Sequence, residues 1–136
     1  MAKRSRTRKR LTRQQTQDLD IEIYFLEGVV QRDPYYVEAM KILSDDYLQR
    51  GHFDLGLDLD EKLIELEPGC PQAFFNLACS YSLNGQMEAA ADALSLAIDY
   101  GYKDWKWIAR EQSLEKLREA ACYQPILGKI QAILTP

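Results

Sequence analysis

Side chains of the same kind recur every 34 residues through the middle of this chain. Pro34 and Pro68 stand 34 positions apart, and the same interval separates Leu43 from Leu77, Tyr47 from Tyr81 and Gly51 from Gly85. A fixed period of this length indicates a supersecondary unit that is repeated and stacked, because one such unit alone cannot bury its apolar face. The interval therefore predicts a repeat protein, and it constrains the fold more than any other feature of the sequence.

Each unit has the pattern of two helices joined by a turn. In the second unit, the apolar residues between positions 73 and 81 follow a helical period. Gly85 stops this helix, since glycine tolerates the left-handed backbone at a helix C-terminus, and a second periodic run ends at Gly101. Small residues at Gly56 and Ala90 would let the two antiparallel helices of each unit approach closely.

The two units, residues 37–70 and 71–104, resemble tetratricopeptide repeats. The first unit departs from the family pattern at Asp60, where an apolar residue is usual, and at Leu63, where a small one is usual. This departure predicts that its second helix is rotated to bury Leu59. The resemblance implies an all-α fold, a short right-handed α-solenoid of antiparallel helix pairs. The second unit departs at Tyr102 and carries the rest of the pattern, namely Phe74, Leu77, Ala78, Tyr81, Gly85, Ala90, Leu94 and Ala97.

The flanking segments are interpreted as caps of a repeat domain that covers residues 16–136, because two stacked units expose apolar faces at both ends. Residues 16–33 predict an N-terminal capping helix. Its acids Asp18 and Asp20 suit the N-terminus. Its buried face is expected to hold Ile21, Phe25 and Val29, with Leu26 as a further candidate.

Residues 105–136 predict C-terminal capping helices. Asp104 is expected to cap the first of them, and the run from Gly101 to Arg118 resembles a closing segment that follows the last repeat in many proteins of the family. The last helix is predicted from Gln124 to Leu134, with Pro125 in its first turn, and its apolar side is expected to comprise Ile126, Leu127, Ile130, Ala132, Ile133 and Leu134.

The resemblance implies that the first helices of successive units line a concave groove that binds a partner peptide or amphipathic helix. Lys41 and Asn76 match two positions of the family's carboxylate-binding clamp, but Asp45 would repel a carboxylate. The alternative is that Phe75 and Leu83 pack against a cap and do not face a ligand. The candidate groove residues are Glu38, Lys41, Asp45, Leu48, Gln72, Phe75, Asn76, Cys79 and Ser82.

No catalytic, metal or cofactor site is predicted. His52 is the only histidine and falls in a turn, so a zinc site or a histidine-based catalytic site has no second ligand or base. The three cysteines form no CxxC pair and suit buried helix faces. The acids at 54, 58, 60 and 65 approach a calcium-loop spacing, but Leu59 stands where that loop needs glycine. The sequence therefore predicts a protein that is not an enzyme.

Charge is divided unevenly along the chain. Residues 1–13 carry seven of the 17 basic residues and no acid, so a segment of charge +7 precedes a body of charge −11. Residues 1–15 are predicted to be a disordered tail, since charges this dense repel one another. In one interpretation the tail binds RNA or DNA nonspecifically, in which case binding weakens steeply with salt. The alternatives are that it serves targeting or solubility, or that it docks on an acidic partner. Its basic residues are Lys3, Arg4, Arg6, Arg8, Lys9, Arg10 and Arg13.

The favoured function is a cytoplasmic protein-binding module, namely a scaffold, an adaptor or a chaperone-like interaction protein. The alternative is an accessory protein of nucleic acid or the ribosome, anchored by the basic tail. A homo-oligomer could form through the cap faces. No apolar run in the sequence approaches the length of a membrane span.

Overall fold

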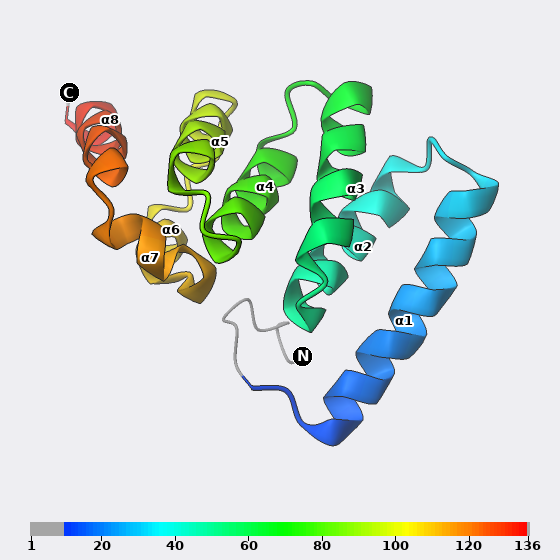
Figure 1. The fold of residues 1–136 in the computed structure, drawn as a ribbon. Coiled ribbons are helices and arrows are strands. Elements are labelled where there is room, and N and C mark those ends of the chain that lie inside the picture. Colours follow the sequence, from blue (N-terminus) through cyan, green and yellow to red (C-terminus); the bar gives the residue numbers. More distant parts are fainter. Residues whose placement is uncertain (1–9, 136) are drawn as a thin grey trace.

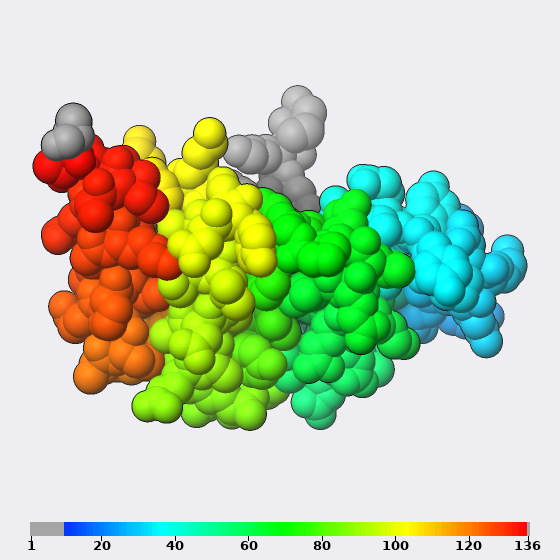
Figure 2. All heavy atoms as spheres, turned by 90° about the horizontal axis from the view of Figure 1, so that it is seen from above, coloured from blue at the N-terminus to red at the C-terminus, as the bar shows by residue number. Residues whose placement is uncertain are grey.

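The computed structural model describes residues 10–135, and every regular element in that range is a helix. The helices pack on their sequence neighbours (Figure 1) and follow one another along an elongated molecule, with α1 and α8 at opposite ends (Figure 2). The predicted all-helical solenoid is confirmed. In chain order the elements are α1 (Arg13–Arg32), α2 (Val37–Arg50), α3 (Phe53–Leu66), α4 (Pro71–Leu83), α5 (Met87–Asp99), α6 (Trp105–Arg110), η1 (Gln112–Leu114), α7 (Glu115–Glu119), η2 (Ala121–Tyr123) and α8 (Gln124–Leu134).

Helix α1 begins earlier than predicted because Thr12 caps it. The Thr12 hydroxyl accepts a hydrogen bond from the backbone N–H of Gln15 at 3.0 Å, and the side-chain oxygen of Gln15 accepts one from the backbone N–H of Thr12 at 2.9 Å. This reciprocal capping box satisfies two backbone donors at the helix start. Asp18 and Asp20, predicted to lie at the N-terminus, instead lie beyond the first turn of the helix.

Removing this cap is expected to destabilise the protein. Thr12→Ala should lower the free energy of unfolding by about 1 kcal/mol, measured by urea denaturation followed by circular dichroism. Thr12→Ser keeps a hydroxyl in the same place and is the matched control, expected to unfold like the wild type. Equal losses in the two variants would show that the capping hydrogen bond is not the cause.

The buried face of α1 differs from the predicted one. Leu19, Ile23 and Leu26 are buried against the next two helices, whereas Ile21 and Phe25 are exposed. Val29 is partly buried in the same cluster, as is Val30. The assignment of Ile21 and Phe25 to the core face is therefore wrong, and the helix carries apolar residues on two opposite sides.

The helical hairpins predicted from the repeat are present. α2 ends at Gly51, whose φ of 83° lies in the left-handed region, and Gly85 has a φ of 79° in the turn between α4 and α5. Both positions favour glycine because a Cβ is strained there. Gly56 is buried where α3 crosses α2, and a Cβ added to it would lie 3.7 Å from the Cβ of Tyr47, which agrees with the predicted close approach.

The core consists of two adjoining hydrophobic clusters. The N-terminal cluster joins α1, α2 and α3 and ends at Cys70 and Ala73. The C-terminal cluster joins α4, α5 and the closing segment, and it includes Leu94, Leu114 and Leu117, which are all fully buried. The two clusters meet at α3 and α4, so each pair of helices is stabilised mainly by the pairs on either side of it.

The C-terminal elements agree with the predicted bounds. The Asp104 carboxylate accepts from the backbone N–H of Trp107 at 3.2 Å and so caps α6, and α8 runs from Gln124 to Leu134 with Pro125 in its first turn. Its predicted apolar side is only partly covered. Ile126 is buried and Ile130 packs against the core, while Leu127, Ala132, Ile133 and Leu134 are exposed.

Candidate functional site

The first helices of the two units lie next to each other and form one side of the molecule. α2 contacts α4, and α4 contacts both η1 and α7 of the closing segment. We call the side formed by α2, α4 and residues 112–116 the first-helix surface. It is the surface on which the resemblance places the candidate groove.

The structure divides the candidate groove residues into two groups. The buried members serve the core in this conformation, and the accessible members form a polar strip along α2 and the start of α4. Glu38 and Gln72 are exposed, and Lys41 and Asp45 are half-buried. The buried members are Leu48, Phe75, Asn76, Cys79 and Ser82.

Phe75 is covered by the closing segment. Its ring stacks on that of Tyr102, with the ring centroids 4.3 Å apart and the planes at 3°, and its side chain is 2% exposed. Cys79 belongs to the same cluster. Phe75 thus packs against the C-terminal cap, which was the alternative to its facing a ligand. Leu83 does not follow it, because its side chain stays partly exposed.

The two residues that match a carboxylate clamp are engaged within the chain. Lys41 forms ion pairs with Glu67 at 3.1 Å and with Glu38 at 3.8 Å, and the hydrogen bond to Glu67 raises the pKa of Lys41. Asn76 is buried and donates to the Ser44 hydroxyl at 3.3 Å. A carboxylate ligand would have to displace both sets of partners.

A buried polar network lies beneath this surface and joins α2, α3 and α4. Ser44 of α2 donates a hydrogen bond to Asp60 of α3 and accepts one from Asn76 of α4. Burial raises the pKa of Asp60 to about 8, and the hydrogen bond from Ser44 opposes that shift. Leu59 is buried as predicted, but Asp60 is buried beside it, so the helix is not rotated away from Asp60.

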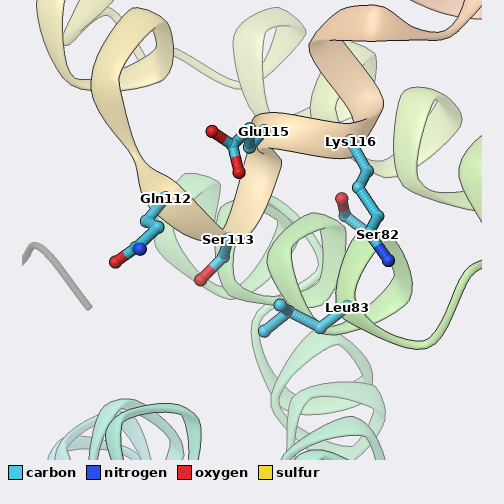
Figure 3. Close-up of a pocket in the computed structure, with 6 residues that line it drawn as sticks. All are labelled: Ser82, Leu83, Gln112, Ser113, Glu115 and Lys116. Carbon is cyan, nitrogen blue, oxygen red and sulfur yellow. The ribbon is translucent and has the colours of Figure 1, made fainter. Parts of the chain in front are cut away.

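An open pocket of about 270 Å³ lies where the end of α4 meets the closing segment. Figure 3 shows side chains from both elements around it, with the Lys116 side chain running toward Ser82. Ser82 is a candidate groove residue, so the pocket continues the predicted surface. It is lined by Ser82, Leu83, Gln112, Ser113, Glu115 and Lys116.

Two hydroxyl groups in this pocket lack hydrogen-bond partners among the described residues. The side-chain oxygens of Ser82 and Ser113 are both fully buried, and neither has a partner in residues 10–135. A buried polar group without a partner destabilises a protein by about 1–3 kcal/mol, so such groups at a pocket wall indicate a place where a polar ligand or water is accommodated.

Sequence reasoning identified Ser82 but missed the residues contributed by the closing segment. The 34-residue period itself could have identified these residues. Ser113 stands 34 residues after Cys79, and Lys116 stands 34 residues after Ser82. Extending the register one unit further would have placed both on the first-helix surface.

A second hollow, of about 450 Å³, lies on the opposite side between α1 and α3. Its walls are mostly apolar and include Val30, Met40 and Leu59, with Lys62 at the edge. The Tyr47 hydroxyl donates to Glu27 at 2.6 Å across it. Because Tyr47 and Glu27 bind each other and most of the wall is apolar, it is a weaker candidate for a polar recognition site than the pocket at Ser82 and Ser113.

The basic tail is largely beyond the described part of the chain. Arg10 and Arg13 are exposed, and Arg13 is the first residue of α1. The predicted disordered segment 1–15 is therefore wrong for its last three residues, which are helical. The other predicted tail residues lie outside the described residues, namely Lys3, Arg4, Arg6, Arg8 and Lys9.

The described range, residues 10–135, contains no group of three or more His, Cys, Asp or Glu side chains arranged to hold a metal ion. None of its helices combines the length and the hydrophobicity that crossing a bilayer requires. His52 is exposed at the start of α3 and lies edge-on to the ring of Tyr47 at 6.2 Å, as a turn residue is expected to do.

Comparison with known proteins gives two partial matches, and no family model matches the chain. A chloroplastic protein of Arabidopsis thaliana is 31% identical over 84 residues, which cover 60% of this chain and 25% of that protein. The PEX5-related protein of Homo sapiens is 30% identical over 77 residues, which cover 57% of this chain and 12% of that protein. The chain thus spans a quarter or less of these curated relatives and is similar to one part of each.

Proposed function

We propose that this chain is a non-enzymatic protein-interaction module of the tetratricopeptide-repeat type, which binds a peptide or helix of a partner on the first-helix surface. The observation that carries the proposal is the pocket at the end of α4, where the buried hydroxyls of Ser82 and Ser113 have no partner in the described chain. Both oxygens are closed to solvent in this conformation, so a polar group of a bound polypeptide would reach them after a local shift of the pocket wall. It would then satisfy them, since each hydroxyl can both donate and accept a hydrogen bond.

The accessible residues of the surface suit an extended or helical polypeptide. Glu38 and Gln72 are accessible on α2 and α4, and the half-buried Asp45 lies further along α2. Leu83 offers an apolar contact at the pocket itself. Polar groups that fix orientation, combined with a few apolar contacts, are typical of peptide recognition.

The proposal is tested by selecting peptides from a random dodecapeptide library displayed on phage against the full chain, and by titrating the enriched peptides calorimetrically. Leu83→Glu and Lys116→Glu each place a new negative charge at the pocket. We expect either variant to weaken binding of the enriched peptides by roughly tenfold or more, as is usual for residues at the centre of an interface.

Lys62→Glu is the matched control, because Lys62 is an exposed lysine of α3 on the opposite side of the molecule. It should change the affinity by less than about twofold, as expected of a residue outside the interface. If the pocket variants bind the peptides as tightly as the control, or if the library yields no binder, the first-helix surface is not the recognition site.

A further inference from the structure

The outer side of α1 is apolar although it faces solvent. Ile21 is 67% exposed, Tyr24 81% and Phe25 65%. At 100° per residue, these side chains lie opposite Leu19, Ile23 and Leu26, which pack against α2. We call Ile21, Tyr24, Phe25 and Gly28, one turn further on, the outer stripe of α1. A helix that is apolar on two opposite sides is normally covered on both of them.

The position of α1 in the array explains why none of the described helices covers its outer stripe. α3 lies between α2 and α4, so it is packed on two sides. α1 packs on α2 at one end of the row and has no helix beyond it in the described residues (Figures 1 and 2). The outer stripe thus occupies the place where another helix would continue the stack.

The residues that flank the outer stripe on the same face of α1 carry opposite charges, Asp18 at one end and Arg32 at the other. Positions 14, 18, 21, 25, 28 and 32 are spaced alternately by four and three residues, which is the spacing of a helix that packs along a second helix. This line begins at Gln14 and Asp18 and ends at Arg32. The Arg32 guanidinium lies over Gly28, 3.9 Å from where a Cβ on that glycine would stand, so it shares the face of the stripe.

We propose that α1 of one copy packs antiparallel on α1 of a second copy through the outer stripe. In this register Ile21 of one copy faces Phe25 of the other, and position 18 of one copy faces position 28 of the other. Because Arg32 covers Gly28, Asp18 of each copy then lies next to Arg32 of the other copy. The arrangement is two-fold symmetric and repeats the same contacts on both sides. Gly28 lowers the stability of an isolated helix relative to alanine, but its lack of a side chain leaves room for the Arg32 guanidinium next to the facing helix.

Charge identifies a second copy as the occupant of the outer stripe. Asp18 and Arg32 are 14 residues apart on one helix, a separation of about 21 Å, so they cannot neutralise each other within one copy. The Asp18 carboxylate accepts only from Gln14 among the hydrogen bonds found in residues 10–135, at 2.8 Å, and no ion pair within that range engages Arg32. An antiparallel second copy supplies the opposite charge at both ends.

Sedimentation velocity of the full chain, from about 1 to 500 µM, tests this proposal, because an interface of one helix pair is expected to be weak. Phe25→Gln should raise the dimer dissociation constant by roughly 30-fold or more, as truncation of a central aromatic contact does. Tyr35→Gln is the control, since Tyr35 is also exposed but lies outside the stripe, and it should dimerise like the wild type. Circular dichroism checks that each variant is folded.

Exchanging the charges at positions 18 and 32 tests whether the two α1 helices pack antiparallel. Asp18→Arg and Arg32→Asp should each raise the dissociation constant by about 5- to 10-fold, because each disrupts two surface ion pairs of the symmetric dimer. The double variant D18R/R32D should restore dimerisation, because the exchanged charges meet again across the two copies. A wild type that stays monomeric at every concentration, or a double variant no tighter than the single ones, would overturn the proposal.

Discussion

From about pH 4 to about pH 8, the free energy of unfolding is expected to fall by on the order of 5 kcal/mol because of Asp60 alone. The ordinary pKa of an aspartate is 3.8, and burial raises that of Asp60 to about 8 in the folded protein. Between these values the unfolded chain has released the proton while the folded chain retains it. Each pH unit therefore favours the unfolded state by about 1.4 kcal/mol.

The sign follows from the raised pKa of the folded state. The stabilisation by neutral Asp60 is fully present below pH 3.8 and is lost as the pH rises through the folded value of about 8. Above that value both states are ionised and the dependence levels off. The expected behaviour is the reverse of that of a carboxylate held by a salt bridge, whose contribution is lost in acid.

Asp60→Asn isolates this effect, because asparagine has nearly the same shape and can still accept the hydrogen bond from Ser44 but does not ionise. Urea denaturation of both proteins at several pH values gives the difference between their unfolding free energies, in which the contributions of other groups cancel. The advantage of the variant should grow between pH 5 and pH 8. If the difference between the two unfolding free energies did not change with pH, Asp60 would not be buried as a neutral acid.

Phe75→Ala is expected to lower the free energy of unfolding by about 3–5 kcal/mol, as other buried Phe→Ala changes do. Phe75 is almost fully buried and stacks on Tyr102, so its removal leaves a cavity between α4 and the closing segment. Because that segment also forms the pocket at Ser82, the disturbed packing should weaken binding at the proposed site as well. Urea denaturation at constant pH measures the effect.

Ile42→Ala is the matched control for this variant. Ile42 is a large apolar residue of α2 that remains 44% exposed, so its truncation should cost less than about 1 kcal/mol, as is usual for surface positions. If Phe75→Ala lowered the free energy of unfolding no more than this control does, and weakened only the binding of peptides, Phe75 would be a ligand contact and not part of the core.

The repeat period was sufficient to predict the central helices. Equivalent residues 34 positions apart mark the same place in each hairpin, so the turns at Gly51 and Gly85 and the helices between them follow from the sequence alone. The C-terminal helix was also predictable, because Pro125 marks a first turn and the apolar period continues to Leu134. Local signals determine these features.

The features that the sequence did not predict depend on contacts between distant residues. α1 has two apolar sides, and periodicity does not say whether Leu19 or Ile21 faces α2. The burial of Phe75 depends on Tyr102, 27 residues further along the chain. Asp60 is tolerated at an apolar position because Ser44 of the neighbouring helix donates to it, and no pattern within α3 contains that information.

The division of the core into two adjoining clusters has a consequence for how the chain opens. Since each helix pair is held chiefly by the pairs on either side, local fluctuations need not spread through the whole array. Amide protons near either end can exchange with solvent through partial opening while those in the middle remain protected. The terminal helices can thus open to meet another molecule without global unfolding.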